Sequence, residues 1–375
     1  MLDVTVLTNN LNVNSKAFNF PILLNSKKLE MRKCKMNIYF SDAFVINNKF
    51  SDDLLHQDLL NCDVLIVNSK SIHNIWCNRR EYLYDFLTMG KNRGVRILWF
   101  DTHDSTACTE FDILPFVDLF LKNQILKNKE EYLEQNSRER IYVKYLNELY
   151  GIREERVLNW ALPKKTELKK IMVSWNSCYE NYTRTRSRIF YKFYQKYIRP
   201  NQNFPLLNTV KFTPVEKKRN TNCSCRINKN YRWKAISQHR FEVENLLSNL
   251  DVVCDKVSLP LFWKELEDSL VSVGPFGLGE ITLRDFEIII TGCALVKPDL
   301  SHMDTWPPLF HENETYIPFK WDLSDFIAIV EDLIIQSDKR EFIANNAQRV
   351  YKKFLLEDED TSYFTDHFMK ILNYL

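Results

Sequence analysis

The sequence predicts an α/β protein made of two Rossmann-like, doubly wound lobes that face each other across a cleft. Short apolar segments alternate with amphipathic ones through the first half, which favours a parallel sheet with crossover helices. The alternation breaks near residues 162–166 and then starts again, and 375 residues are long for a single hydrophobic core. With 45% hydrophobic residues, the chain can fill two cores. We therefore expect one lobe in residues 1–165, a second in 166–355 and a final helical segment in 356–375.

The first lobe is expected to consist of short strands joined by helices. Strands are predicted at 4–7, 36–40, 63–67, 95–100 and 117–121, and helices at 52–60 and 79–89. Polar residues follow strand 95–100, and ligands of such folds bind beyond the carboxyl ends of the strands. Asp101, His103 and Asp104 are therefore candidates for proton transfer or for holding a substrate, because a histidine near carboxylates can be tuned as an acid or a base. The competing interpretation is an ordinary polar loop.

The second lobe is expected to repeat this alternation and to end in helices. Strands are predicted at 170–175, 224–227, 252–257, 270–273 and 294–297, and helices at 184–197, 233–250, 323–336, 339–355 and 362–372.

A glycine-rich loop follows strand 270–273 and is the most informative stretch of the chain. Gly274, Gly277 and Gly279 are three of only 7 glycines in the sequence, so backbone freedom is concentrated where a ligand could approach closely. A helix that starts near Glu280 would direct its unpaired N–H groups and its positive dipole end at phosphate oxygens. Glu287, further along this helix, could accept paired hydrogen bonds from ribose hydroxyls. Alternatively, both glutamates form exposed ion pairs with an arginine on one helix face.

Residues 286–296, Phe-Glu-Ile-Ile-Ile-Thr-Gly-Cys-Ala-Leu-Val, resemble the donor-nucleotide site of GT-B glycosyltransferases of the large group-1 superfamily, which is retaining and family 4-like. The resemblance implies a GT-B fold, a nucleotide-diphosphate-sugar donor in the second lobe, and a terminal helix that crosses back to the first. It also implies that Glu287 binds the donor and that the configuration of the transferred sugar is retained. The first glutamate of the family pattern aligns with Gly279, and Glu280 stands one place later. This departure leaves a catalytic role of Glu280 as an expectation only.

Positive charge is concentrated in one segment of the second lobe. Residues 184–240 hold 15 Lys and Arg but one acid. A departing nucleoside diphosphate needs cationic stabilisation, and the candidate phosphate ligands are Arg226, which is preferred, with Arg232, Lys234 and Arg240. Each could instead be an ordinary surface charge. The aromatic and basic pattern of 184–197 fits contact with anionic lipid or with an anionic acceptor, or a helix whose aromatic face is buried in the lobe.

Composition excludes several classes of protein. The net charge of +2 makes no general case for nucleic acid, and the nine scattered cysteines do not resemble the disulfide framework of a secreted chain. No zinc-ligand spacing, phosphate-binding P-loop or nucleophile elbow occurs, and the sole Asp-x-Asp of the metal-dependent transferases lies in the acidic run 357–360. Residues 2–8 indicate a strand rather than a signal peptide. No apolar run is long enough to cross a membrane, so we expect a cytoplasmic protein for which shallow membrane contact stays open.

The sequence therefore predicts a glycosyltransferase that needs neither a metal nor a cofactor and that moves a sugar from a nucleotide-diphosphate donor to a glycan or glycolipid acceptor. A nucleotide-sugar epimerase on the same scaffold is one alternative. A non-catalytic binder of nucleic acid or an anionic surface through residues 184–240 is another, although we expect no nucleic-acid partner.

Overall fold

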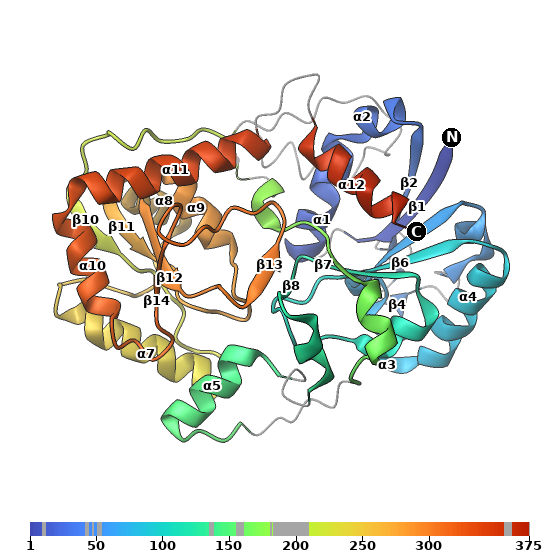
Figure 1. Cartoon of the computed structure of the whole chain (residues 1–375), viewed down its shortest axis with the longest axis horizontal. Helices are drawn as coiled ribbons and strands as arrows, with labels where there is room; N and C mark the ends of the chain where they lie inside the picture. Colours follow the sequence, from blue (N-terminus) through green and yellow to red (C-terminus); the bar gives the residue numbers. More distant parts are fainter. Residues whose placement is uncertain are drawn as a thin grey trace.

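The computed structural model describes residues 1–9, 13–41, 45–46, 49–50, 55–134, 139–154, 161–180, 182, 210–355 and 362–374. The helix expected at 184–197, the acidic run 357–360 and the first part of the helix expected at 52–60 lie outside the described residues. Two separate parallel sheets, each flanked by helices, form the two ends of an elongated molecule (Figure 1).

The first lobe has a six-stranded parallel sheet in the order β2-β1-β5-β6-β7-β9. Its strands are β1 (Leu2–Thr8), β2 (Cys34–Phe40), β5 (Val64–Asn68), β6 (Arg96–Asp101), β7 (Leu119–Lys122) and β9 (Ile171–Val173). Its helices are α1 (Val13–Leu24), α2 (Ser26–Met31), α3 (His73–Asn78) and α4 (Arg80–Asn92), with short 3-10 helices at Gln57–Leu60, Ser69–Ile72, Phe111–Phe116, Lys129–Leu133, Lys165–Lys170 and Ser177–Tyr179. A small hairpin, β3 (Val45–Ile46) with β4 (Lys49–Phe50), lies outside the main sheet.

Successive residues of the central strands enter two different hydrophobic cores. In β5, Val64 and Ile66 pack in the core that contains α1, whereas Leu65 and Val67 pack in the core on the opposite face with α4. Every residue of β5 is buried. This two-sided burial explains why the strands of this lobe are continuous apolar runs rather than alternating ones.

The second lobe has a four-stranded parallel sheet in the order β10-β11-β12-β14. The strands are β10 (Thr221–Ser224), β11 (Ser269–Val273), β12 (Ala294–Pro298) and β14 (Ile317–Phe319), and the helices are α7 (Lys234–Ser248), α8 (Leu259–Asp268), α9 (Leu283–Thr291), α10 (Phe326–Ile335) and α11 (Ser337–Leu355). Segment 252–257, which was expected to be a strand, is not part of this sheet.

Strand β9 corrects the placement of segment 170–175. This segment was expected in the second lobe, but β9 pairs in parallel with β7 and forms the edge of the first sheet. Lys170, just before it, donates hydrogen bonds to the carbonyls of Leu114 and Val117 in the first lobe. An apolar pattern identifies a strand, but it does not identify the sheet edge that the strand joins.

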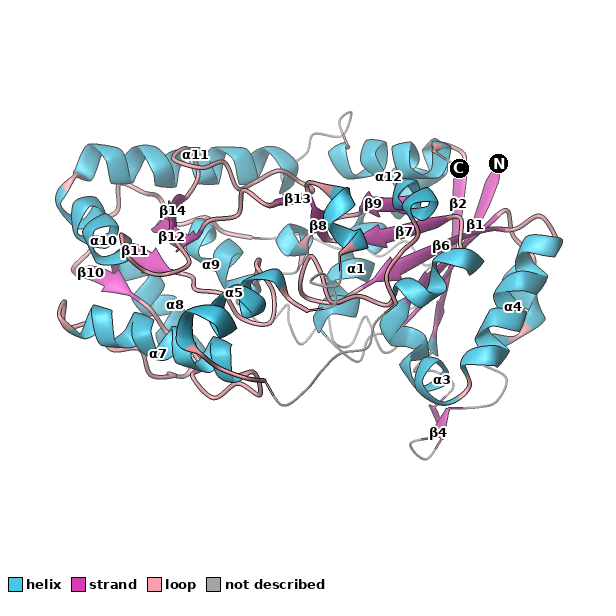
Figure 2. Ribbon diagram, turned by 60° about the horizontal axis from the view of Figure 1, so that its bottom comes forward, coloured by secondary structure: helices cyan, strands magenta, loops and turns pink. Residues whose placement is uncertain are grey.

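Several segments cross between the lobes. Strand β8 (Gln124–Leu126) pairs antiparallel with β13 (Met303–Thr305), and helix α5 (Ile141–Tyr150), which precedes the second lobe in sequence, packs beside α7 (Figures 1 and 2). The terminal helix α12 (Tyr363–Asn373) lies on the first lobe (Figure 1), where the Phe364 ring is 5.1 Å from that of Trp175 and Arg32 pairs with Asp366 at 2.9 Å. The carboxyl ends of both sheets therefore meet at one region of the molecule.

Candidate functional site

The glycine-rich loop links β11 to α9, and a buried ion pair fixes its far end. Helix α9 begins at Leu283, later than the expected start near Glu280. The backbone N–H of the capping residue Thr282 donates to Asp285 Oδ2 at 2.7 Å. Lys297 Nζ lies 3.1 Å from the same oxygen and donates to the Glu280 carbonyl at 2.6 Å. Both side chains of this pair are fully buried, so the first turn of α9 is held in one position.

The three glycines of the loop serve different purposes. A Cβ at Gly274 would lie 2.6 Å from a buried carboxylate oxygen of α9. A Cβ at Gly279 would collide with the backbone carbonyl of Asp104 in the first lobe. A Cβ at Gly277 would lie 3.1 Å from a guanidinium nitrogen of Arg240, on the side of the pocket described next. Of the two glycines expected to bind the donor, Gly277 therefore packs against side chains that line the pocket without lining it itself, and Gly279 allows contact between the lobes.

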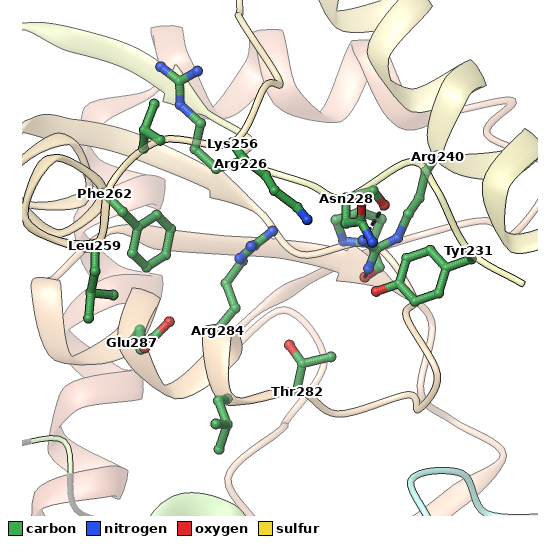
Figure 3. A pocket seen from close by; sticks show the side chains of 13 residues that line it. Arg226, Asn228, Tyr231, Arg240, Lys256, Leu259, Phe262, Thr282, Arg284 and Glu287 are labelled. Atoms are coloured by element: carbon green, nitrogen blue, oxygen red, sulfur yellow. Dashed lines mark hydrogen bonds between the residues drawn. The ribbon is translucent and has the colours of Figure 1, made fainter. Parts of the chain in front are cut away.

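A pocket of about 470 Å³ opens at the start of α9 (Figure 3). Its lining comes from loops at the carboxyl ends of the second sheet and from α8 and α9: Arg226, Asn228, Tyr231, Arg240, Lys256, Val257, Leu259, Phe262, Pro275, Thr282, Leu283, Arg284 and Glu287. Three residues expected from the sequence, Glu287, Arg226 and Arg240, are among them. Arg232 and Lys234 are exposed and do not line this pocket.

Two of the pocket arginines are bound to the protein itself. Arg226 turns its guanidinium away from the cavity (Figure 3), with Nε 2.9 Å from Glu265 Oε1 and a terminal nitrogen 2.6 Å from Oε2. Arg240 is buried and donates to the carbonyls of Phe276 at 2.7 Å and Asn228 at 3.0 Å. Both side chains shape the wall of the pocket. The structure thus shifts the choice of phosphate ligand away from Arg226.

Two other cations extend into the cavity. Figure 3 shows the side chains of Lys256 and Arg284 directed into the pocket, with Glu287 below the Phe262 ring. Among the described residues, Arg284 Nε is buried without a hydrogen-bond partner, and the guanidinium carbon lies 5.4 Å from the centre of the Phe262 ring. From the sequence, the arginine of this helix was expected only as a surface ion-pair partner, and Lys256 was not among the expected ligands. The position of Lys256 could have indicated a ligand site, because segment 252–257 was expected to be a strand and ligands bind beyond the carboxyl ends of strands.

The first lobe contributes an aspartate–histidine pair at the end of β6. Asp101 is fully buried, and its Oδ1 accepts from the backbone N–H of His103 at 3.0 Å and from Nδ1 at 2.5 Å. Its Oδ2 accepts from Lys122 Nζ at 2.6 Å and from the Thr109 hydroxyl. Burial alone would raise the pKa of Asp101, but Lys122 and His103 outweigh it and hold this pKa well below its ordinary value. Asp101 therefore stays ionised and orients the imidazole, whose Nε2 faces the other way.

Asp104 and Glu280 meet at the contact between the lobes. The Asp104 carbonyl accepts from the side-chain amide of Gln124 and touches the glycine loop. Glu280 is fully buried and accepts from the Thr106 hydroxyl at 2.6 Å, from its backbone N–H at 3.1 Å and from Gln124 Nε2 at 2.9 Å. His302 Nε2 lies 3.7 Å from the same carboxylate. Although burial raises the pKa of Glu280, His302 and Thr106 outweigh it, so the net shift is downward.

Glu280 is therefore an ionised side chain that links the two lobes through hydrogen bonds. It precedes α9 instead of lying on it, and it is not among the residues that line the pocket. The alternative in which Glu280 forms exposed ion pairs along a helix face is wrong, because the side chain is fully buried.

Helix α5 and its capping residue also hold the backbone of the glycine loop. The Tyr142 hydroxyl donates to the carbonyl of Gly277 at 2.9 Å, and Arg140 Nε donates to that of Leu278 at 2.6 Å. Residues 277–280 are therefore bound both to the first lobe, through Glu280, and to α5, which packs beside α7. The loop thus connects the pocket on one side with the aspartate–histidine pair on the other.

Metal sites, disulfide bonds and membrane-spanning helices would point to other classes of protein. Over the described ranges, no group of three or more His, Cys, Asp or Glu side chains is arranged to hold a metal ion. Among the described residues no disulfide bond is formed, and Cys223 and Cys225 are buried in a core of the second lobe. Within the same part of the chain, no helix combines the length and apolar character needed to span a bilayer.

No protein-family model matches the sequence, and no curated protein matches it either. Among solved structures, the apo form of the lipopolysaccharide outer core galactosyltransferase WaaB aligns with a TM-score of 0.51 at 11% identity, covering 100% of this chain and 99% of that one. Anabaena HepE in complex with UDP and glucose aligns at 0.47 and 10% identity, covering 100% of both chains. A glycosyltransferase from Rickettsia africae aligns at 0.46 and 10% identity, covering 100% of this chain and 97% of that one.

At such low identity, the full-length alignment with WaaB concerns the fold and not individual residues. It agrees with the two parallel sheets, the facing carboxyl ends and the terminal helix that lies on the first lobe. The prediction of two Rossmann-like lobes is confirmed: the chain has the GT-B fold of glycosyltransferases.

Proposed function

We propose that this chain is a glycosyltransferase that binds a nucleotide-diphosphate-sugar in its second lobe and transfers the sugar to a glycan or glycolipid acceptor at its first lobe. The observation that carries the proposal is the pocket at the start of α9, where two cations and one carboxylate face a cavity of about 470 Å³. A nucleoside diphosphate offers chemically matching groups, namely an anionic diphosphate, a ribose with vicinal hydroxyls and a flat base.

The diphosphate is assigned to the first turn of α9. Thr282, Leu283 and Arg284 line the pocket there, and the positive end of the helix dipole favours an anion. Lys256 and Arg284 supply positive charge from two different elements. Their charge would stabilise the diphosphate as it departs, without needing a metal ion.

The nucleoside is assigned to the other end of the pocket. Glu287 lies one turn further along α9 and is half-buried beside Phe262, whose ring forms part of the pocket wall. A carboxylate can accept hydrogen bonds from both ribose hydroxyls, and charged acceptors make such bonds stronger. The apolar side chains of Val257 and Leu259 line the same region.

The transferred sugar would then extend across the glycine loop towards His103 in the first lobe. Retention of configuration is part of the proposal, as the resemblance in residues 286–296 implies, so that His103 holds sugar hydroxyls rather than acting as the essential base. We also propose a cytoplasmic location with shallow membrane contact, because a glycolipid acceptor would lie at a membrane surface.

A thermal-shift panel tests the proposal. Uridine, guanosine, adenosine and cytidine diphosphates and their sugars are added far above their dissociation constants, which raises the apparent stability by about 3–4 kcal/mol for a ligand at 100 to 1,000 times its Kd. The best donor is then incubated, labelled in the sugar, with and without acceptors. Transfer only with an acceptor supports the proposal, whereas sugar isomerisation without one supports the epimerase alternative. No response to any nucleotide, together with binding of polyanions that falls steeply with salt, would favour the non-catalytic alternative.

A further inference from the structure

One residue of the nucleotide pocket, Tyr231, has no role in the function proposed above. It lines the cavity from the loop between β10 and α7. Within the described ranges, the hydrogen bonds of Tyr231 are made by its backbone. Its N–H donates to the Lys229 carbonyl at 3.1 Å and to Ser237 Oγ at 2.9 Å, and its carbonyl accepts from the Ser237 hydroxyl at 3.2 Å. Over these ranges the phenol hydroxyl therefore keeps its capacity to donate one hydrogen bond and to accept another.

The surrounding residues hold Tyr231 in one position. The guanidinium carbon of the buried Arg240 lies 4.7 Å from the centre of the Tyr231 ring, a favourable cation–π distance. The Asn228 side chain accepts from the N–H of Asn230 at 3.3 Å and donates to the Asn230 carbonyl at 3.2 Å, which fixes the loop just before Tyr231. A hydroxyl that is held in place before a ligand arrives loses little entropy when it forms a hydrogen bond.

The Tyr231 hydroxyl lies beside the glycine loop, near the point where the second lobe meets the first. A Cβ on Gly277 would be 3.4 Å from this hydroxyl, and a Cβ on Gly279 would collide with the backbone of the first lobe. Figure 3 shows Tyr231 on the opposite side of Arg284 from Glu287, with its hydroxyl directed into the pocket.

The order of these side chains along the pocket matches the order of groups in a nucleotide-diphosphate-sugar. Glu287 is assigned to the ribose and Arg284 to the diphosphate, so the group beyond the diphosphate reaches Tyr231. We propose that the Tyr231 hydroxyl forms a hydrogen bond with one hydroxyl of the transferred sugar and thereby contributes to the choice of sugar; this inference rests on the proposed transferase function. A site that hydrogen-bonds a substrate hydroxyl discriminates against sugars that lack it.

A diphosphate oxygen could also accept the proton of the same phenol, so the test separates the two sources. It compares the wild type with Tyr231→Phe, which removes the hydroxyl and keeps the ring that packs on Arg240. The probes are the nucleoside diphosphate with the largest thermal shift among those of uridine, guanosine, adenosine and cytidine, and its glucose and galactose derivatives. Isothermal titration calorimetry measures the Kd of each probe.

We expect Tyr231→Phe to affect the sugar derivative alone. The variant should bind the nucleoside diphosphate within about twofold of the wild type and the preferred sugar derivative roughly 3- to 10-fold more weakly, because one hydrogen bond between neutral groups is lost. Tyr374→Phe removes an exposed phenol hydroxyl just after α12 and is the matched control. It should bind both probes like the wild type.

Donors whose sugar lacks one hydroxyl at a time identify the partner of Tyr231. One of these deoxy donors should bind the wild type and Tyr231→Phe with equal affinity, because two removals from the same hydrogen bond are not additive. The other deoxy donors should keep the difference between the two proteins. A general disturbance of the pocket would instead weaken every probe, including the nucleoside diphosphate.

Three results overturn the inference and leave the transferase proposal intact. They are unchanged affinity of Tyr231→Phe for the sugar derivatives, equal weakening of the nucleoside diphosphate and its sugar derivatives, and a difference that persists with every deoxy donor. Failure of the wild type to bind any nucleoside diphosphate or nucleotide sugar overturns both.

Discussion

Replacement of Glu287 by alanine is the most direct test of the nucleotide pocket. The side chain is half-buried at the pocket wall, near Phe262 and on the opposite side of Arg284 from Thr282 (Figure 3). If its carboxylate accepts one hydrogen bond from each ribose hydroxyl, the variant loses two bonds to a charged group. At about 1.5–3 kcal/mol for such a bond, and with some compensation by water, the net loss of binding free energy is about 2–4 kcal/mol. Affinity for the nucleoside diphosphate should therefore fall by roughly 30- to 1,000-fold.

Isothermal titration calorimetry measures this loss directly. Glu331→Ala, which removes an exposed glutamate from helix α10 of the same lobe, is the control and should bind like the wild type. A 2′,3′-dideoxynucleoside diphosphate adds a second control, since the wild type and Glu287→Ala should bind it with similar affinity. If Glu287→Ala binds the ordinary nucleotide as tightly as the wild type does, the assignment of this pocket to a nucleoside diphosphate is refuted.

Three further predictions concern charge and packing. Arg284→Ala should weaken nucleotide binding by roughly tenfold or more in the same calorimetry, whereas Arg226→Ala, which breaks an ion pair with Glu265, should change it far less. Asp101→Asn leaves the fully buried Lys122 without its counter-ion and should lower the free energy of unfolding by about 3–5 kcal/mol in urea titrations; a loss below 1 kcal/mol would contradict the role of this pair. Gly279→Ala should lower the melting temperature, because its Cβ meets a backbone carbonyl of the other lobe that cannot move aside cheaply, while Leu278→Ala at an exposed neighbouring position should not.

The features that sequence could predict are those set by neighbouring residues. Asp101 and His103 are two positions apart after an apolar strand, and the structure joins them by two hydrogen bonds. The pattern around Glu287 likewise places it on a helix after a glycine loop, and the structure puts it at the wall of a pocket. Local spacing along one strand or one helix carries enough information for such statements.

The features that sequence could not predict depend on partners distant in the chain. Arg226 follows a strand as expected, but Glu265 from another helix takes its guanidinium. The spacing of Glu280 predicts a place on α9, yet its carboxylate is buried against Thr106 and Gln124 of the other lobe. The residue type at one position does not tell which side chain from a distant part of the sequence will pack against that residue.

The two lobes use the same physical device to fix their functional groups. In the first, Lys122 at the end of β7 pairs with Asp101 in the neighbouring strand, and Asp101 in turn orients His103. In the second, Lys297 near the end of β12 pairs with Asp285, whose carboxylate fixes the start of α9. All four members of these pairs have side chains that are 0% exposed. Because removing both charges from water costs about as much as their attraction returns, such pairs are poor sources of stability. Their value lies in direction: each aspartate has its position fixed by a lysine and in turn fixes a functional group, the imidazole in one lobe and the first turn of a helix in the other.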